Sequence, residues 1–316
     1  MDNLCHTLAG AALGAAGLRT RTTRATATLM IASNLPDIDV AVFATDTLAM
    51  SFRRGWTHGV LAMGVLPVAL ATAMWLWDRW RGGGKAGQTT HVAANFSGLL
   101  LLSFIGNWLH VLMDFLNSYG VRLLMPFSER WFYGDALYIV DPFLYVALGG
   151  AVVAGRWWGR GRHATRRPAQ IAVAVAALYM AIMAGSNLWA RSVVRDGLSR
   201  AGRPAGTRFM VTPVFANPFR REVIVDVGER YEKGFLWFEP APHFRPAGYG
   251  VDTNLTRPEV IAAASVPRAA AFLRWSRFPF AAIDETSRQP RIFLNDYRYS
   301  GPSGRDGWAT QEIALP

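Results

Sequence analysis

The chain has 316 residues, of which 51% are hydrophobic and only 17% charged, and its formal net charge is +11. A disordered chain has low hydrophobicity and high charge, so this composition excludes disorder, and it is untypical of a wholly soluble protein. The single cysteine, Cys5, excludes a disulfide scaffold. Basic residues do not alternate with aromatic ones in any stripe, so nucleic acid is not an expected partner.

Long apolar segments occupy the first part of the chain. A helix needs about 20 apolar residues to cross a membrane. Four segments have this length, a fifth is interrupted by Asn34-Leu35-Pro36-Asp37-Ile38-Asp39, and a sixth has only 15 residues. In chain order they are Leu4–Leu18, Ala25–Thr45, Trp56–Trp77, Val92–Phe115, Ala136–Gly155 and Ala169–Ala190. The sequence therefore predicts about five or six membrane helices within residues 1–190.

Basic residues divide unevenly among the loops that join these segments. Loops 46–55 and 116–135 hold four of them, and the loops that alternate with these hold 11. The 11 are Arg19, Arg21, Arg24, Arg79, Arg81, Lys85, Arg156, Arg160, Arg162, Arg166 and Arg167. Cytoplasmic loops carry an excess of Lys and Arg, so these loops are predicted to lie in the cytoplasm. The remainder of the chain, residues 191–316, is then predicted to lie outside it.

Residues 191–316 contain no long apolar run. The predicted strands are Arg208–Val214, Arg221–Val227, Tyr231–Phe238 and Arg291–Tyr299, and the predicted helix is Val260–Trp275. The expected fold is an all-α polytopic membrane helical bundle, residues 1–190, followed by a small α+β extramembrane domain, residues 191–316. That domain could cover a site in the membrane part or serve as a docking module.

Several ionisable residues stand within or beside the apolar segments, where each costs a few kcal/mol and by default marks function. Each also has a structural interpretation. Asp37 and Asp39 could cap a helix break, and His58 and His6 could be interfacial histidines. Asp141 precedes Pro142, which makes it a natural helix N-cap.

His110 and Asp114 are four residues apart in a strongly apolar segment, so they share one helix face. They could form a simple hydrogen-bonded pair, but this spacing also suits a metal-binding pair. Arg54, which lies just before His58, is a residue suited to contact with a phosphate or carboxylate.

The predicted membrane topology brings these residues together. With alternating helix directions, they all fall at the outward ends of their helices: His6, Asp37, Asp39, Arg54, His58, His110, Asp114 and Asp141. Unrelated structural roles would scatter them over both sides of the membrane. Histidine and aspartate supply the nitrogen and oxygen ligands of Zn²⁺, Mn²⁺ or Fe²⁺. The sequence therefore predicts a divalent metal site with one or two ions at the outer surface of the membrane.

The same residues carry a family resemblance. The matching pieces are His6-Thr7-Leu8-Ala9-Gly10, Leu35-Pro36-Asp37-Ile38-Asp39, Arg54-Gly55-Trp56-Thr57-His58, His110-Val111-Leu112-Met113-Asp114, Pro126-Phe127 and Asp141-Pro142. They resemble the YdjM/YbcI-type inner-membrane proteins, a family described as LexA-regulated, metal-dependent hydrolases. The resemblance covers about residues 1–190, and Asn217-Pro218-Phe219-Arg220 is similar to an Asn-Pro-x-x-Arg stretch beyond the last span. One departure is Gly59, where the family usually has serine.

The resemblance implies hydrolysis by an integral protein of the inner membrane. The expected metal is zinc, with Mn²⁺ or Fe²⁺ as alternatives, and its main ligands are expected to be His58, His110 and Asp114. Asp37 and Asp39 are further ligands or a bridging carboxylate, and His6 is another candidate ligand. Asp141 or another free carboxylate is the candidate general base, and Arg54 would stabilise an anionic substrate or transition state. The position at the bilayer surface favours an ester or phosphoester of a lipid or lipid-linked molecule, and no protein partner is indicated. The alternatives are a non-enzymatic membrane protein (structural, stress-related or metal-sensing) and a transporter with an ion site.

Overall fold

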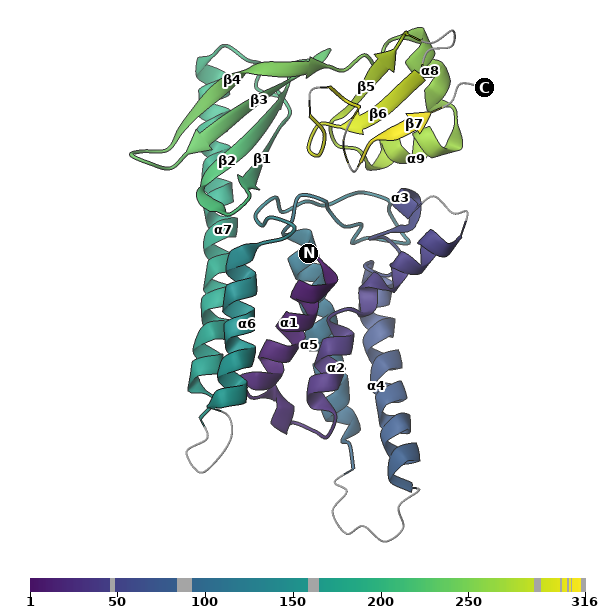
Figure 1. Ribbon diagram of the computed structural model, residues 1–316, viewed down its shortest axis with the longest axis vertical. Helices are drawn as coiled ribbons and strands as arrows, with labels where there is room; N and C mark the ends of the chain where they lie inside the picture. The colour runs from purple at the N-terminus through teal and green to yellow at the C-terminus, as the bar shows by residue number, and fades with distance from the viewer. Residues whose placement is uncertain are drawn as a thin grey trace. The chain divides into compact units, whose positions relative to one another are not determined.

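The computed structural model describes residues 1–45, 49–83, 93–158, 165–286, 291–301, 303–305, 307 and 309–313. Two compact units make up the chain (Figure 1). The first, the helical unit, consists of Met1–Ala41 and Arg53–Ser186, and the second, the C-terminal unit, consists of Val42–Phe52 and Asn187–Pro316. Of the basic loop residues, Lys85, Arg160 and Arg162 lie outside the described residues.

The elements described up to residue 200 are all helices, and the segment between α5 and α6 is not helical. Its elements are α1 (Asn3–Ala15), η1 (Leu18–Thr20), α2 (Ala25–Ala32), η2 (Leu35–Ala44), α3 (Ala49–Phe52), α4 (Val60–Gly83), α5 (Phe96–Phe115), α6 (Pro142–Trp157) and α7 (Arg167–Arg200). Among the described residues, three helices are long and apolar enough to cross a membrane, namely α4, α5 and α7. A fourth span results if α2 and η2, which are bent by 51°, count as one. The membrane helical part is thus confirmed, whereas five or six spans are not, because α1 and α6 have only 13 and 16 residues.

Side-chain caps fix where three of these helices begin. Asp2 Oδ1 accepts hydrogen bonds from the backbone N–H groups of Leu4 and Cys5 at the start of α1. Asn95 caps α5 in the same way, and Asp141 caps α6, whose first residue is proline. A cap satisfies N–H groups that the first turn of a helix leaves without partners. The caps therefore set which residues of each helix stand at its end.

Small residues let α2 pack closely between α1 and α5. A Cβ atom at Gly10 of α1 would lie 2.7 Å from the carbonyl oxygen of Leu29, and one at Gly106 of α5 would lie 2.6 Å from the Cβ of Ala32. Only glycine permits such close approach, as is common where helices pack in membranes. Figure 1 shows that the N-terminus, η2 and the segment after α5 gather at one end of these helices.

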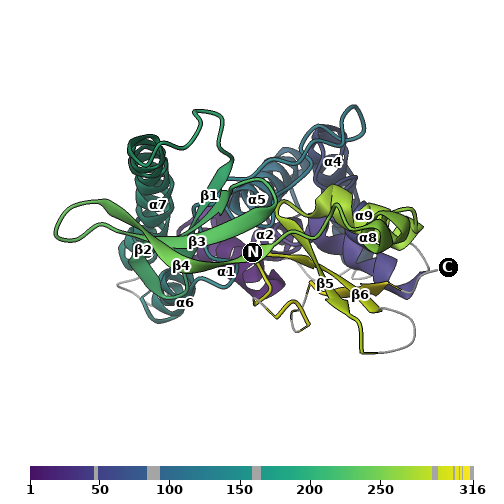
Figure 2. The ribbon, with the colours of Figure 1, turned by 90° about the horizontal axis from the view of Figure 1, so that it is seen from above.

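The C-terminal unit is α+β, as expected. One sheet contains β1 (Phe209–Val214), β2 (Asn217–Asp226), β3 (Arg230–Trp237) and β4 (His243–Asp252), all antiparallel in the order β1-β2-β3-β4. A second contains β5 (Pro279–Asp284), β6 (Arg291–Asp296) and β7 (Gln311–Ile313). The short helices α8 (Pro258–Ala264) and α9 (Pro267–Trp275) lie together beside this second sheet (Figure 2). The last part of α7 packs on the first sheet through Ala190, Val194 and Leu198.

Asp296 is a buried charge that stabilises the second sheet. It pairs with Arg298 at 2.8 Å and accepts a hydrogen bond of 2.6 Å from Ser276. Burial alone would raise its pKa, but the charge of Arg298 and these hydrogen bonds hold the pKa below the usual range. A carboxylate with a lowered pKa stabilises the fold above its unfolded-state pKa of about 3.9, and this contribution is lost as the pH falls through the folded-state value.

Replacement of Asp296 by asparagine is therefore expected to destabilise the C-terminal unit at pH 7 by about 3 kcal/mol, because Arg298 remains buried without its counter-charge. The loss of stability between neutral and acid pH should become smaller than in the wild type. Thermal unfolding of the full chain in detergent, followed by near-ultraviolet circular dichroism at several pH values, measures both effects. An Asp252→Asn variant, which changes a largely exposed carboxylate, is the control. Equal melting temperatures for the Asp296 variant and the wild type at pH 7 would contradict this assignment.

Candidate metal centre

Four of the predicted residues come together at one end of the helical unit. Asp37 lies in η2, His58 lies just before α4, and His110 and Asp114 lie one turn apart on α5. All four are buried, with exposed fractions of 2% for Asp37 and 0% for the others. One ligand atom from each lies within 4.8 Å of the other three.

The distances between these atoms suit a single small cation. His58 Nε2 and His110 Nε2 are 3.2 Å apart, and they lie 3.4 and 3.5 Å from Asp114 Oδ2. Asp37 Oδ1 lies 4.0 Å from the first nitrogen and 3.9 Å from the second. Ligands bound tetrahedrally at 2.0–2.1 Å stand about 3.3 Å from one another. The two nitrogens and Asp114 Oδ2 are therefore spaced as the ligands of one such ion would be, and Asp37 Oδ1 lies somewhat farther out.

The outer ring nitrogen of each histidine has a partner that fixes the tautomer. His110 Nδ1 lies 2.7 Å from the carbonyl oxygen of Ser33, which can only accept, so Nδ1 carries the proton. His58 Nδ1 lies 3.0 Å from Thr57 Oγ1, whose hydroxyl donates to Asp39 Oδ2 over 3.2 Å. In the neutral rings, both Nε2 atoms then present lone pairs toward the centre. Histidines that bind metals are held by their outer N–H in this way.

Among the described residues, no group donates a hydrogen bond to the carboxylate oxygens that face the centre, although Arg53 Nη2 lies 3.7 Å from Asp37 Oδ1. Asp37 Oδ1 and Asp114 Oδ2 are buried and have no hydrogen-bond partner among the described residues. Buried polar atoms in folded proteins are nearly always satisfied, so each orphan needs an explanation. Two carboxylate oxygens and two imidazole lone pairs would repel one another at these distances. A divalent cation is the group that fits this set of ligand atoms, because it satisfies all four at once.

Arg54 orients one of the ligands instead of facing the centre. Its Nη2 donates to Asp114 Oδ1 over 3.0 Å and its Nη1 donates to Asn117 Oδ1 over 3.2 Å. The guanidinium lies over the ring of Tyr119 at 4.5 Å, and the Met1 amino group also contacts Asp114 Oδ1. With one oxygen fixed by these cations, the other oxygen of Asp114 faces the two histidines. Only 7% of the surface of the Arg54 side chain is exposed.

Asp39 lies on the outer side of His58 and is not one of the four clustered residues. Its Oδ2 accepts the backbone N–H of Arg54 over 2.7 Å and lies 3.6 Å from His58 Nδ1. Arg54 adopts a left-handed conformation with φ of 51°, which is uncommon for a residue with a side chain. This backbone geometry presents the N–H to Asp39 and the guanidinium to Asp114 at the same time. Asp39 is thus placed to hold the ring of His58.

Replacement of Asp39 by alanine should weaken metal binding without emptying the site. Loss of a residue that holds a ligand typically costs 10–100-fold in metal affinity, so about 30-fold is expected here. Competition with a chromogenic chelator on the detergent-purified protein measures this change. An Asp252→Ala variant should bind as the wild type does. An unchanged affinity in the Asp39 variant would show that its contact with His58 does not support the site.

The two remaining predicted residues, His6 and Asp141, are not among the four clustered residues. His6 stacks on His110 with ring centroids 3.8 Å apart, and its Nε2 lies 3.4 Å from Asp114 Oδ1. Both ring nitrogens of His6 are buried and without a hydrogen-bond partner in the described part of the chain. Asp141 caps α6 and accepts a hydrogen bond of 2.9 Å from Tyr179. The structure therefore places His6 beside the four residues and gives Asp141 the capping position that its neighbouring proline indicates.

Three supporting groups were not anticipated from the sequence. They are the carbonyl oxygen of Ser33, the hydroxyl of Thr57 and the ring of Tyr119. A backbone carbonyl leaves no trace in the residue type, so Ser33 could not be recognised. Thr57 had a usable signal, because a hydroxyl residue directly before a candidate ligand can reach that ligand's outer nitrogen.

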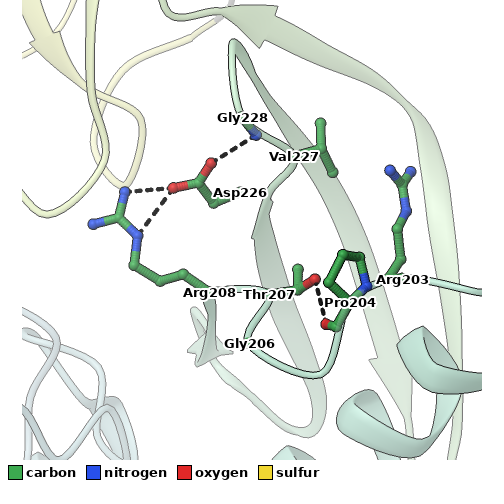
Figure 3. A pocket seen from close by; sticks show the side chains of 8 residues that line it. All are labelled: Arg203, Pro204, Gly206, Thr207, Arg208, Asp226, Val227 and Gly228. Atoms are coloured by element: carbon green, nitrogen blue, oxygen red, sulfur yellow. Dashed lines mark hydrogen bonds and ion pairs between the residues drawn. The ribbon is translucent and has the colours of Figure 1, made fainter.

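A pocket of about 380 Å³ lies in the C-terminal unit, between the segment 203–208 that precedes β1 and the end of β2 with the turn that follows it (Figure 3). Its two arginines are already neutralised. Arg208 binds Asp226 at 2.7 Å, and Arg203 binds Glu232 at 3.1 Å. Figure 3 also shows Asp226 accepting the backbone N–H of Gly228, over 3.0 Å. These contacts close a turn of the sheet, and we assign the pocket no ligand.

Comparison with known proteins gives one match. Neither the curated proteins nor the solved structures contain a match to this chain. Residues 1–190, which are more than half of the chain and include all four residues of the candidate centre, match the family described as YdjM inner membrane protein. The chain therefore belongs to the YdjM inner membrane protein family.

Proposed function

We propose that this protein is a membrane-bound, metal-dependent hydrolase whose divalent ion is held by Asp37, His58, His110 and Asp114. The observation that carries the proposal is the convergence of four ligand atoms within 4.8 Å of one another. Two of these atoms are buried carboxylate oxygens without a hydrogen-bond partner among the described residues. Such a centre is costly to build at the end of an apolar helix unless a cation occupies it.

The ligand set favours zinc, with Mn²⁺ or Fe²⁺ as alternatives. Two nitrogen and two oxygen ligands suit all three ions, and the near-tetrahedral spacing suits zinc best. Structural zinc sites are usually rich in cysteine, whereas the single cysteine of this chain, Cys5, is not one of the four residues. A mixed histidine and carboxylate set is more typical of a catalytic site.

A bound divalent ion would polarise the scissile group and lower the pKa of a water molecule to near 7. The protein must then accept a proton and bind an anion. We propose His6 as the proton acceptor, because both of its ring nitrogens are without hydrogen bonds to described residues and it stacks on His110. Asp141, the candidate base from the sequence, is held by Tyr179 and the start of α6.

Arg53 is better placed than Arg54 to contact an anionic substrate. Its Nη2 lies 3.7 Å from Asp37 Oδ1 and its Nε donates to Asp39 Oδ1 over 3.4 Å, but 24% of its side chain is still exposed, against 7% for Arg54. Arg54 instead directs its guanidinium at Asp114 and Asn117. We therefore propose that Arg53 binds the anionic group of the substrate, whereas Arg54 keeps Asp114 in position.

Exposed apolar side chains near these residues in the chain support an amphiphilic substrate. Ile38, between Asp37 and Asp39, is 50% exposed, and Trp56, two residues before His58, is 53% exposed. A polar, water-soluble substrate would gain no binding free energy from such an apolar surface. An acyl chain would gain it by burying apolar area there. We propose an ester or phosphoester of a lipid or lipid-linked molecule as the substrate class.

We further propose that the site and the C-terminal unit face the extracytoplasmic side of the inner membrane. The division of basic residues among the loops supports this orientation. It also requires α1 and α6 to cross the membrane as short helices, which gives six crossings. A periplasmic reporter enzyme fused to the C-terminal unit should be active. An active cytoplasmic reporter at the same position, with no periplasmic activity, would reverse the orientation.

A second candidate function is a purely structural metal site. Four protein ligands that are at most 2% exposed favour it, because structural sites are closed and catalytic sites keep an open position. The ion would then connect α5 with η2 and with the segment before α4, and the protein would not be an enzyme.

One set of measurements separates the two candidates. The protein is purified in detergent, its metal content is determined, and hydrolysis of a chromogenic phosphoester, a chromogenic ester and a phospholipid panel is measured. The proposed enzyme should show hydrolysis that disappears on chelation and in a His6→Gln variant that retains its metal. Bound metal that raises the melting temperature, with no hydrolysis of any substrate, would favour the structural site. A His243→Gln variant, altered in the C-terminal unit, should match the wild type in both assays.

A further inference from the structure

The sequence Asn217-Pro218-Phe219-Arg220-Arg221 begins β2 directly after the turn at Phe215 and Ala216. Asn217 Oδ1 accepts the backbone N–H of Phe219 over 3.0 Å. Arg221, whose side chain is fully buried, donates to the carbonyl oxygen of Pro218 over 2.8 Å. Ala216 adopts a left-handed conformation with φ of 53°, which reverses the chain. These contacts fix the shape of the hairpin tip, residues 214–219, and so fix the direction in which its side chains point.

The hairpin tip exposes two large aromatic side chains. Phe215 is 55% exposed and Phe219 is 60% exposed. Both belong to the hairpin tip, whose backbone is held by the contacts described above. Two exposed phenylalanines on a rigid turn are an apolar surface that water does not favour. This surface needs an environment that accepts aromatic rings.

Contacts within the C-terminal unit place the hairpin tip at a defined level of α7. The backbone N–H of Phe238 donates to the carbonyl oxygen of Phe219 over 3.2 Å. The ring of Phe238 lies 5.5 Å from the ring of Trp189 on α7. Figure 1 shows the β1–β2 turn beside this helix. Phe219 therefore stands at the level of Trp189. Trp189 is 54% exposed, and its neighbour Leu188 is 69% exposed.

The order of residues along α7 identifies that level. α7 is one uninterrupted helix and a candidate membrane span. Its apolar part ends at Ser186 and Asn187, after which come Leu188 and Trp189 and then Arg191 and Arg195. An apolar run followed by tryptophan and then arginine is the usual order where a helix leaves the hydrocarbon and meets the lipid head groups. Trp189 thus marks the bilayer interface.

We propose that Phe215 and Phe219, together with Leu188 and Trp189, form a membrane anchor that inserts among the lipid head groups and holds the first sheet on the bilayer surface. The occupant of this surface is lipid, because the surface continues the apolar face of a membrane-spanning helix at the depth where that helix emerges. This role accounts for the Asn-Pro-x-x-Arg sequence, whose Asn217 and Arg221 side chains shape the hairpin.

The anchor is testable by fluorescence quenching in the intact protein. Cys5 is the single cysteine, so a Cys5→Ser background allows one bimane label at each of four positions: Phe215→Cys, Phe219→Cys, Tyr249→Cys and Ile261→Cys. The last two are matched controls, because Tyr249 and Ile261 are exposed apolar residues of the same unit, in β4 and α8. Each labelled protein is placed in nanodiscs of phosphatidylcholine and phosphatidylglycerol, with or without bromine on the acyl chains near the head group.

Brominated lipid should quench the labels at 215 and 219 at least about twofold more strongly than those at 249 and 261, because interfacial residues contact the upper acyl chains. Equally weak quenching at all four positions would overturn the proposal. Weak quenching at 215 and 219 combined with excimer emission from pyrene at the same positions would also overturn it, because the surface would then bind a second copy of the chain. Melting temperatures of the labelled proteins establish that each is folded.

Discussion

Replacement of His110 by alanine is expected to lower the affinity for the bound divalent ion by more than about a hundredfold, because loss of a residue that merely supports a ligand already costs 10–100-fold. His110 Nε2 lies within 3.5 Å of both His58 Nε2 and Asp114 Oδ2, so its removal opens the centre of the cluster. Any metal-dependent hydrolysis should disappear together with the ion. Metal content by mass spectrometry and chelator competition measure the loss.

The matched control is His243→Ala, which changes a histidine of the C-terminal unit and should leave metal content unchanged. The stacked neighbour His6 provides a second comparison, since His6→Gln should retain the ion if this residue acts on protons and not as a ligand. Retention of a full equivalent of metal by the His110 variant would exclude this residue as a ligand.

Replacement of Asp114 by asparagine should cost about 3–5 kcal/mol of stability even without metal, because it leaves a buried guanidinium without its counter-charge. Arg54 donates to Asp114 over 3.0 Å, and its side chain is only 7% exposed. Replacement of Arg54 by methionine removes the buried charge and keeps much of the packing on Tyr119. The double variant Arg54→Met, Asp114→Asn should therefore be more stable than Asp114→Asn alone.

A double-mutant cycle in the presence of chelator measures this coupling. The stability losses of the two single variants should add up to about 2 kcal/mol more than the loss measured for the double variant. This coupling is within the usual range for residues in direct contact. Thermal melting in detergent provides the four stabilities. Additive losses would show that Arg54 does not hold Asp114, and the orientation of that carboxylate would then need another cause.

The helical part was predictable because apolar runs and arginine-rich loops leave a strong signal, but the helix limits were not. The apolar run Ala136–Gly155 suggested a full span, whereas α6 begins only at Pro142. Leu137 instead forms a bridge with Asn117, and Asp141 caps the helix at a proline, where a helix favourably begins. A run of apolar residues does not reveal at which of them the helix begins.

The sheets were predicted in part. Strands were predicted at β1, β2, β3 and β6, but β4, β5 and β7 were missed. β4 contains Pro246, Gly248 and Gly250, which are unfavourable in strands, and it is tolerated because it lies at the edge of its sheet. The single helix predicted over Val260–Trp275 is divided into α8 and α9, because Pro267 disfavours helical geometry at Val266.

The candidate site was recognisable because histidine and aspartate are expensive in apolar segments. The sequence could not distinguish Asp37 from Asp39, since both lie in η2 and either could face the centre. The choice depends on the left-handed conformation of Arg54, whose backbone N–H binds Asp39. Likewise, the stacking of His6 on His110 follows from the packing of α1 and α2 through Gly10, which residue types alone do not specify.

X-ray absorption spectroscopy of the purified protein, loaded with zinc and dialysed, tests the central claim most directly. We predict one ion per chain with only nitrogen and oxygen ligands at about 2.0–2.1 Å, including the scattering of two imidazoles. The signal should be lost in the His110→Ala variant and unchanged in His243→Ala. A protein that retains no stoichiometric ion, or one whose ion shows no imidazole scattering, would contradict a metal centre formed by Asp37, His58, His110 and Asp114.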